Sequence, residues 1–402
     1  MLRQFLDLPR SIHILCLGTL INRAGSFVVL FLTFYLQERL QLGGIFATQA
    51  IGFFGLGTLL AALVGGHLAD TIGRRTVILI SLLGGACVLV MFPLIKQPLL
   101  ILLATLVFAF LAEMYRPAVS AMISDIVPVE QRPHAFGLMY IAVNLGAAVA
   151  PLVGGMLATR AFEWLFWGDA ATSAAYAVIV AFSVKETLHR DRPDAAAASG
   201  EQPQTRSALA DWGRVLRDAT FMRFCAGTLL VSFVFMQAMS TLPLYMKSLS
   251  LGPEVYGRTI ALNGLLVVIL QVPMTHLVSR FNRTRMITLA ALTIGVGFGL
   301  SALASTPTAF ALTVVVWTFG ELMQSPLVPT IVSDLAPATL RARYFGLLSM
   351  CFSGGNLIAA PIGGWVLVRY GGDWLWGGCV ATAVCSAALY ATVRVRTNHT
   401  HP

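Results

Sequence analysis

Five ionisable side chains lie inside long apolar runs, where charged residues are rare: Arg23, Glu113, Arg116, Asp169 and Glu321. Placing one such charge at the centre of a bilayer costs about 2.5–3.5 kcal/mol on insertion scales, so these residues are expected to be paired or used. A carboxyl group can gain and lose a proton in such surroundings, whereas arginine stays positively charged. All five are therefore candidate proton-coupling residues.

Glu113 and Arg116 lie three residues apart and share one face of a predicted helix. Together with Arg23, they place two permanent positive charges near one titratable acid. Burial favours the neutral form of Glu113 and a nearby arginine favours its charged form, so a conformational change that alters these contacts would bind or release a proton. The alternative is a permanent ion pair that joins two helices.

The other two acids have fewer charged neighbours. Glu321 has Gln324 nearby and no arginine. It is therefore expected either to be protonated, to be available to a cationic substrate, or to be hydrogen-bonded to neighbouring helices. Asp169 lies nearer the end of its apolar run, where it would act as a gate or cap the start of the sixth predicted helix.

The composition is that of a polytopic, all-helical membrane protein. Of the 402 residues, 57% are hydrophobic and 11% are charged, and the mean hydropathy is +0.78. Soluble domains carry about 25% charged residues. A crossing helix needs roughly 20 apolar residues, so the chain has room for about twelve. The predicted crossings are 13–36, 45–69, 75–94, 98–123, 133–158, 163–184, 221–247, 254–278, 286–304, 308–332, 342–367 and 374–393. The first of these is too long for a signal-peptide core and is expected to be retained.

The distribution of basic residues predicts the orientation. The side of the N-terminus carries 19 Lys and Arg residues, the opposite side carries 6, and Arg23 and Arg116 lie within the apolar runs. The positive-inside rule then places both termini and the central loop in the cytoplasm, and we expect a bacterial cytoplasmic (inner) membrane. The net charge of +9 does not indicate a nucleic-acid partner, because the basic residues do not cluster with aromatic residues on a soluble domain.

Motifs of other protein classes are absent from the sequence. The six cysteines lie in apolar runs without C-x-x-C spacing, so neither disulfides nor a metal site are expected. There is no P-loop and no H-E-x-x-H motif, and no Ser/His/acid set lies in a plausible soluble site. The sequence therefore predicts neither an enzyme nor a cofactor, and an ion gradient or the substrate's own gradient is the expected energy source.

The two halves of the chain repeat each other at an offset of about 209 residues. The repeated segments are Ser124-Asp125 and Ser333-Asp334, Phe136-Gly137-Leu138 and Phe345-Gly346-Leu347, Gly154-Gly155 and Gly363-Gly364, and Trp167-Gly168 and Trp376-Gly377. We expect six-helix bundles over 1–184 and 221–402. The segment 185–220, rich in Ala, Ser, Gln and Pro, is a predicted flexible linker with a short amphipathic helix at 209–217.

A charged loop joins the second and third predicted crossings: Gly66-His67-Leu68-Ala69-Asp70-Thr71-Ile72-Gly73-Arg74-Arg75. It resembles the G-x-L-A-D-R-x-G-R-R signature of the major facilitator superfamily and departs from it at Thr71. The resemblance implies two pseudo-symmetric six-helix bundles with the substrate site between them. It also implies that Gly66, Asp70, Gly73, Arg74 and Arg75 latch the two halves together on the cytoplasmic side. The alternative is that these arginines only set topology.

A second motif lies in the fifth predicted crossing, where Gly137, Gly146, Pro151, Gly154 and Gly155 follow one another. It is similar to the signature of the drug:proton antiporter branch of the superfamily, with Ala150 in place of the usual glycine. The resemblance implies a seal against proton leak, whereas ordinary small-residue packing is the alternative. The branch's usual helix 4 arginine corresponds to Val107, so its role is not transferred to Arg116.

Aromatic, Met and amide side chains offer adaptable surfaces for varied amphipathic molecules. Candidates for the substrate cavity are Asn22, Phe27, Phe31, Tyr140, Asn144, Phe233, Phe235, Met236, Gln237, Tyr245, Asn263, Gln271, Trp317, Gln324 and Asn356.

Together these features predict a monomeric secondary transporter in the lipid bilayer that exports small amphipathic molecules in exchange for protons. A proton symporter or uniporter of a nutrient or metabolite is the first alternative. A sensor or scaffold that does not transport is the second.

Overall fold

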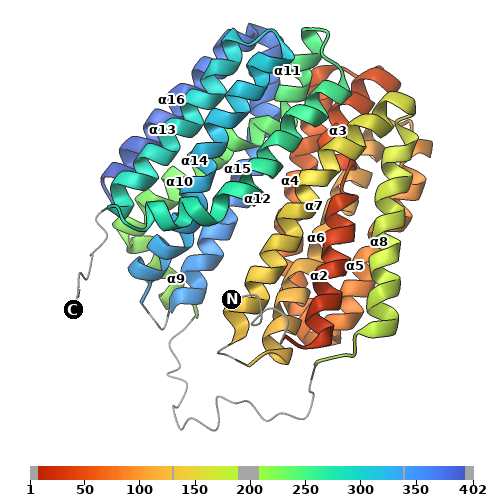
Figure 1. Ribbon diagram of the computed structural model, residues 1–402, viewed down its shortest axis with the longest axis vertical. Coiled ribbons are helices and arrows are strands. Elements are labelled where there is room, and N and C mark those ends of the chain that lie inside the picture. Colours follow the sequence, from red (N-terminus) through yellow and green to blue (C-terminus); the bar gives the residue numbers. More distant parts are fainter. Residues whose placement is uncertain (1–7, 129–130, 189–207, 338–339, 394–402) are drawn as a thin grey trace.

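The structure, a computed structural model, describes residues 8–128, 131–188, 208–337 and 340–393. The regular elements in these ranges are all helical, and twelve helical segments are long and apolar enough to cross a membrane. They form two six-helix bundles that lie side by side (Figure 1). This confirms the predicted fold class. Of the predicted linker, residues 189–207 lie outside the described residues.

The first bundle contains the first six crossings, red to yellow-green in Figure 1. Crossing 1 consists of α2 (Arg10–Ala24), α3 (Val28–Phe34) and the π-helix η1 (Tyr35–Arg39), and the others are α4 (Gly44–Ile72), α5 (Arg74–Met91) with η2 (Phe92–Leu94), α6 (Pro98–Ile126), α7 (Arg132–Arg160) and α8 (Glu163–Ser183). We call the face at which α2 begins the near face, at the bottom of Figure 1, and the other the opposite face.

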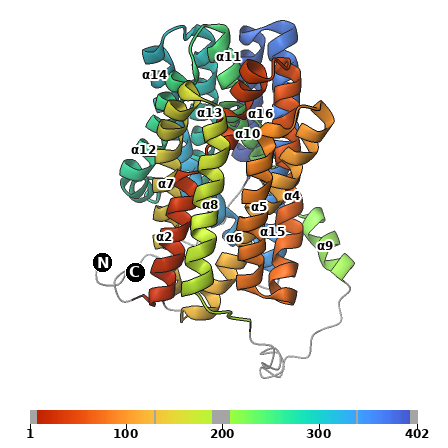
Figure 2. The ribbon, with the colours of Figure 1, turned by 90° about the vertical axis from the view of Figure 1, so that its right-hand side faces the viewer.

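The second bundle repeats this order. Its crossings are α10 (Ala219–Ser240) with α11 (Leu242–Ser248), α12 (Pro253–Val278), α13 (Arg283–Gly299) with η4 (Leu300–Leu303), α14 (Pro307–Leu335), α15 (Arg341–Tyr370) and α16 (Gly372–Ala391). The short helix α9 (Ala208–Arg217) lies beside the near-face end of this bundle and buries Val215 (Figure 2). Proline in the first turn of α6, α12 and α14 marks where these helices begin, since its missing N–H has no helical partner there.

Crossing 1 is interrupted, although one continuous helix was predicted over 13–36. Its first part, α2, ends at Ala24 and α3 begins at Val28. Gly25 lies directly against the side chain of Thr172 in α8, in a space that has no room for a Cβ atom. Crossing 7 was also predicted as one helix, over 221–247, but it breaks at Thr241, just before Pro243.

The two largest interfaces between the halves are related by the repeat. α7 meets α12 where a Cβ atom on Gly155 would lie 3.2 Å from Cα of Glu254 and 3.5 Å from Cα of Gly257. α4 meets α15 where Gly364 lies against Thr48. At the 209-residue offset, Gly364 is the counterpart of Gly155, and Gly257 that of Thr48. Small residues at both interfaces let the backbones approach closely.

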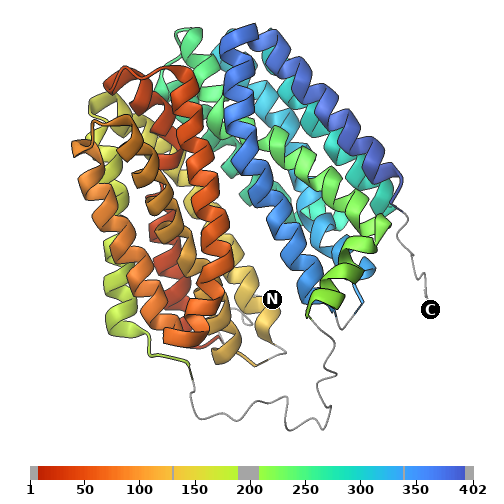
Figure 3. The same ribbon diagram turned by 180° about the vertical axis from the view of Figure 1, so that it is seen from behind.

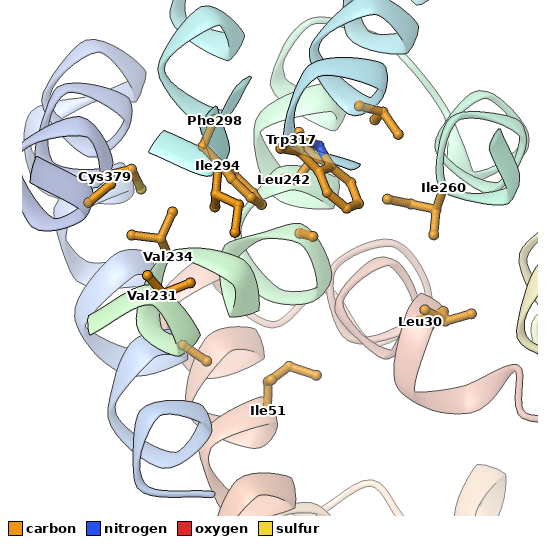
Figure 4. Close-up of a cluster of buried hydrophobic side chains, with 14 of the residues drawn as sticks. Leu30, Ile51, Val231, Val234, Leu242, Ile260, Ile294, Phe298, Trp317 and Cys379 are labelled. Atoms are coloured by element: carbon orange, nitrogen blue, oxygen red, sulfur yellow. The ribbon is translucent and has the colours of Figure 1, made fainter. Parts of the chain in front are cut away.

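The halves are in contact toward the opposite face and diverge toward the near face (Figures 1 and 3). Near the opposite face, Glu38 pairs with Lys247 at 3.7 Å, and the ring of Tyr256 lies 5.7 Å from those of Phe31 and Phe34. Deeper in the bundle, apolar side chains of both halves meet, with Leu30 and Ile51 facing a group around Trp317 (Figure 4).

Candidate functional site

Three of the predicted charges form one cluster, which we call the charge cluster. Glu113 Oε2 lies 2.7 Å from Arg116 Nε, and Glu113 Oε1 lies 3.3 Å from Arg23 Nη2. Arg116 follows Glu113 by one helical turn in α6, while Arg23 is in the last turn of α2. The side chains of Arg23 and Glu113 are 14% and 16% exposed, but that of Arg116 is 53% exposed. One acid therefore bridges a buried and an accessible cation.

A hydrogen-bonded chain holds Arg23 in place. Its Nη2 donates to Tyr115 Oη at 3.1 Å, and the Tyr115 hydroxyl donates to Asn22 Oδ1 at 3.3 Å. Asn22 Nδ2 in turn donates to Ser173 Oγ at 2.9 Å. Neither Tyr115 nor Ser173 was among the predicted site residues. A single tyrosine or serine inside an apolar helix is common, and its partners become visible only when α2, α6 and α8 are packed together.

The charge cluster lies on the wall of a cavity of about 460 Å³ between the two halves, the inter-half cavity. Its walls come from α2, α3, α4 and α6 of the first half and from α10 and α15 of the second. The lining residues are Arg23, Val29, Ile51, Phe54, Gly55, Thr58, Ala62, Glu113, Arg116, Pro117, Met236, Met239, Ser349, Phe352 and Ser353. A mixed wall of apolar, methionine and hydroxyl groups beside one charged cluster suits a small amphipathic molecule.

Glu321 lies in a different place, on the wall of a cavity of about 450 Å³ in the second half, the second-half cavity. The ion pairs among the described residues do not include Glu321. Asn263 Nδ2 donates to Glu321 Oε2 at 2.6 Å and to Thr318 Oγ1 at 3.0 Å. Phe352 lines this cavity as well as the inter-half cavity, so the two adjoin.

Asp169 is 4% exposed and does not cap α8, because it is the seventh residue of that helix. Its Oδ2 instead accepts a hydrogen bond of 3.4 Å from the backbone N–H of Val28, the first residue of α3. The sequence suggested that Asp169 caps the start of α8. Its hydrogen bond is instead made at the start of α3, in the interrupted first crossing. An anion suits this position, because the first N–H groups of a helix have no partner within it.

Among the described residues, the ion pairs and hydrogen bonds of the signature loop join it to the first half and to Glu186. Arg74 pairs with Asp70 and with Asp125, at 3.1 Å each, and Arg75 Nη2 donates to the carbonyl oxygen of Ala181 at 2.6 Å. Gly73 adopts φ +107°, which a side chain would disfavour. Gly66 has open space around its Cβ position, so no neighbouring atom requires a glycine there. No ion pair or hydrogen bond among the described residues forms the predicted latch between the halves, and the latch stays a prediction.

Glu186, which the sequence analysis did not single out, completes this loop. It accepts hydrogen bonds from the backbone N–H groups of Arg74 and Arg75 at 3.0 and 3.1 Å. Partial burial opposes the charged form, but backbone donors that include Leu188, Thr187 and Arg74 hold the pKa of the Glu186 carboxyl below its usual value. The repeat preserves part of this arrangement, since Arg283 pairs with Asp334 at the positions equivalent to Arg74 and Asp125.

The glycines of the fifth crossing face other helices. A Cβ atom on Gly146 would lie 2.6 Å from Cβ of Arg23, and one on Gly154 would lie 2.5 Å from the ring of Phe31. Gly155 faces α12 of the other half. Gly137 and Pro151 also lie in α7. These close contacts agree with small-residue packing, and a seal against proton leak stays a prediction.

The predicted cavity residues separate into several groups. Met236 lines the inter-half cavity, Phe235 and Gln324 line the second-half cavity, and Asn22 and Asn263 support Arg23 and Glu321. Others are engaged elsewhere: Phe27, Phe31, Gln237 and Trp317 are buried in packing, Tyr245 packs on Trp376, Phe233 accepts from Gln237 through its backbone, Asn144 donates to the carbonyl of Tyr140, and Tyr140 meets Gln271 at 3.5 Å. Asn356 belongs to α15, but its side chain lies outside the described part of the chain.

Comparisons with known proteins agree with this architecture. A family model for the Major Facilitator Superfamily matches residues 15–257 and 238–402. A Na(+), Li(+), K(+)/H(+) antiporter of Planococcus maritimus is 26% identical over 96% of this chain and 96% of its own. Multidrug resistance protein MdtH of Edwardsiella ictaluri (strain 93-146) is 21% identical over 88% of this chain and 86% of its own.

A solved structure of a POT family transporter in complex with a thioalcohol-conjugated peptide superposes with a TM-score of 0.80. It is 14% identical and covers 96% of this chain and 98% of its own, so the likeness concerns the fold alone. The family match spans almost the whole chain. The chain is therefore a multi-pass membrane protein that belongs to the Major Facilitator Superfamily of transporters.

Proposed function

We propose that this transporter exports small amphipathic molecules, cationic or neutral, in exchange for protons. The observation that carries the proposal is a titratable acid, Glu113, held between Arg23 and Arg116 on the wall of the inter-half cavity. A carboxylate here is stabilised by two cations, and protonation would weaken both pairs. Proton binding would thereby alter the contact between α2 and α6. Both helices belong to the first half, which would move as one body during transport.

The transport cycle follows from where the halves meet. With the near face in the cytoplasm, as the basic residues indicate, this conformation has its cavity toward the cytoplasm and its halves closed at the opposite face. The protein would work as a monomer in a bacterial cytoplasmic membrane. The halves would then rock to open the opposite face, and the loop around Asp70 would form its latch to the second half in that state.

Glu321 supplies the preference for cationic molecules. Its cavity is lined largely by apolar side chains, among them Phe235, Phe345 and Phe352. With no cation paired to Glu321 among the described residues, a positively charged substrate would gain a carboxylate partner there and bury its apolar part against these rings.

A second candidate, antiport of monovalent cations and protons, is favoured by the polar side chains near Glu321. Asn263 Nδ2 donates both to Glu321 Oε2 and to Thr318 Oγ1, so a carboxylate and a hydroxyl oxygen flank one amide, and oxygen ligands suit alkali-metal ions. The relative from Planococcus maritimus carries the name of such an antiporter. Adding Na⁺, Li⁺ or K⁺ to vesicles with an acidic interior would raise the internal pH if this candidate is correct.

The test uses proteoliposomes that contain a pH-sensitive dye, after a thermal-shift screen of the purified protein has identified a ligand. We expect that adding the ligand outside acid-loaded vesicles raises the internal pH, because substrate enters as protons leave. Symport would lower the internal pH, and uniport would leave it unchanged. Lack of substrate flux in any condition would favour the sensor or scaffold.

Glu113→Gln tests the role assigned to the charge cluster. The amide can still accept a hydrogen bond from Arg116 but cannot carry the proton, so we expect the pH change to disappear while exchange of labelled ligand down its gradient continues. Glu163→Gln is the matched control, because Glu163 pairs with the 61% exposed Arg39 away from the cavity. Normal pH-driven transport by Glu113→Gln would remove Glu113 from the mechanism.

A further inference from the structure

A small polar chamber of about 50 Å³ lies behind the charge cluster, inside the first half. The lining residues are Asn22, Arg23, Ser26, Val29, Phe54, Ser81, Leu82, Gly85, Phe108, Ala112, Glu113, Asp169 and Ser173. A buried water needs about 10–15 Å³ of such volume and two to four polar partners. The chamber therefore has room and hydrogen-bonding groups for about three waters.

The chamber and the inter-half cavity adjoin, and Arg23, Glu113, Val29 and Phe54 line both. Asp169 lines the chamber and is not among the residues around the inter-half cavity. A proton on Glu113 can thus come from the cavity on one side and leave into the chamber on the other. Asp169 is the second carboxyl group on the wall of that chamber.

The charged groups that face Asp169 are few. Arg23 approaches from α2, and Glu113 lies across the chamber on α6. α3 contains no charged residue, and α5 and α7 carry theirs only in their end turns, at Arg74, Arg75, Arg132, His134 and Arg160. Arg23 is therefore the cation, and Glu113 the other acid, on the wall of the chamber that Asp169 lines.

An aromatic cluster closes the first half beyond Asp169. Phe166, one turn toward the opposite face on α8, stacks on Phe92 at 4.9 Å and meets Tyr35 edge-on at 4.7 Å. Phe162 also meets Tyr35, at 6.0 Å. Tyr35, Phe92 and Phe166 are at most 1% exposed. In this conformation Asp169 shares the chamber with Glu113, and the aromatic cluster lies between Asp169 and the opposite face.

We infer that Asp169 is a second proton-carrying residue, which exchanges protons with Glu113 through the chamber and passes them to the opposite face when the halves rock. The inference rests on the proposed proton coupling. In the exchange, the Glu113 carboxyl becomes a carboxylate paired with both arginines, and the Asp169 carboxylate becomes a carboxylic acid. A protonated Asp169 also accepts the Val28 N–H more weakly, which loosens the start of α3 at the interruption of crossing 1.

The test compares Asp169→Asn with Asp373→Asn in the proteoliposome assay. The amide of Asp169→Asn keeps an oxygen acceptor for the Val28 N–H but cannot carry a proton. We expect it to exchange ligand down a gradient and to lose the ligand-driven pH change. Asp373→Asn, the same chemical change at the start of α16, keeps both activities.

Three outcomes are possible. Loss of the pH change in Asp169→Asn with exchange retained supports the inference. An unchanged ratio of protons to ligand in this variant overturns it, while leaving the proposed function standing. A wild-type protein that transports ligand but moves no protons overturns the proposed function and the inference together.

A measurement on the unaltered chain covers the case in which Asp169→Asn does not assemble. Dicyclohexylcarbodiimide reacts with protonated carboxyl groups in apolar surroundings, and mass spectrometry locates the modified residue. We expect modification of Asp169 to increase as the medium becomes more acidic, and Glu113→Gln to alter that pH dependence, because the charge across the chamber changes. Modification of Asp169 that is independent of both would contradict the inference.

Discussion

The α7–α12 contact offers a way to shift the balance between the two conformations without touching a charged residue. Gly264 of α12 faces Ala148 of α7 across the interface between the halves. A Cβ atom on Gly264 would lie 2.5 Å from Cα, 2.8 Å from Cβ and 3.1 Å from N of Ala148. Ordinary van der Waals contact begins near 3.4 Å, and backbone atoms cannot rotate away, so Gly264→Ala must move the helices apart by about 1 Å.

Overpacking of this kind costs about 1–3 kcal/mol where the helices are tightly packed. The penalty falls on the state in which α7 and α12 are in contact at this level, the state closed at the opposite face. If the open state relieves it, the ratio of the two states shifts by about 5- to 150-fold toward opening at the opposite face. The fold of each half should remain intact, because the new methyl group lies between the halves.

Double electron–electron resonance can measure the shift. Spin labels at Lys96→Cys and Arg369→Cys, both exposed near the opposite face, report the separation of the halves once the six native cysteines have been replaced. We expect Gly264→Ala to transfer population to longer distances. Gly378→Ala, a helical glycine with open space around its Cβ position, is the control and should leave the distances unchanged. An unaltered distribution in Gly264→Ala would refute rigid closure at this contact.

Two further predictions concern the signature loop. Asp70→Asn should slow turnover with little change in the ligand concentration for half-maximal transport. Because Asp70 is 67% exposed, its ion pair contributes at most about 1 kcal/mol to stability, so the variant should fold. A defect confined to affinity would argue against a latch. The second prediction follows from the lowered pKa of Glu186. The Glu186 carboxylate stabilises the fold at pH values above its pKa in the unfolded chain, about 4.3, and this contribution is lost as the pH falls through its lower pKa in the folded protein. The melting temperatures of wild type and Glu186→Gln should therefore differ near neutral pH and converge in acid.

The long-range order of the fold was readable from sequence because it rests on hydropathy and repetition. Twelve apolar runs correspond to twelve crossings, and the 209-residue offset predicted two similar bundles. The pairing of Glu113 with Arg116 followed from helical spacing alone. Hydropathy, repetition and helical spacing can all be read directly from the order of residues in a single sequence.

What could not be predicted depends on contacts between distant segments. At the interruption of crossing 1, two residues of α8 contact the first crossing: Thr172 meets Gly25, and Asp169 accepts a hydrogen bond from Val28. Gly25 and Ser26 were a local signal for it, but glycine is also common in continuous membrane helices. The role of Glu186 was equally hidden, since its partners at Arg74 and Arg75 lie more than 100 residues away.

The repeat separates the scaffold of this transporter from its chemistry. Gly146 of α7 packs on Leu20 and Arg23 of the first crossing, and its counterpart Gly355 packs on Leu229 and Ser232, the equivalent positions in the seventh. The packing is thus common to both halves, although the side chains differ.

The charge cluster is present in only one of the two halves. Arg23, Glu113 and Arg116 correspond to Ser232, Leu322 and Ser325, so the second half has no equivalent of the charge cluster. Glu321 lies one residue from the counterpart of Glu113, and its hydrogen-bond donor is Asn263 rather than an arginine. Glu113 therefore pairs with two fixed cations, whereas the hydrogen-bond partner of Glu321 is neutral. Under the proposed function, this difference would place proton exchange in the first half and cation binding in the second, and rocking of the halves would couple the two.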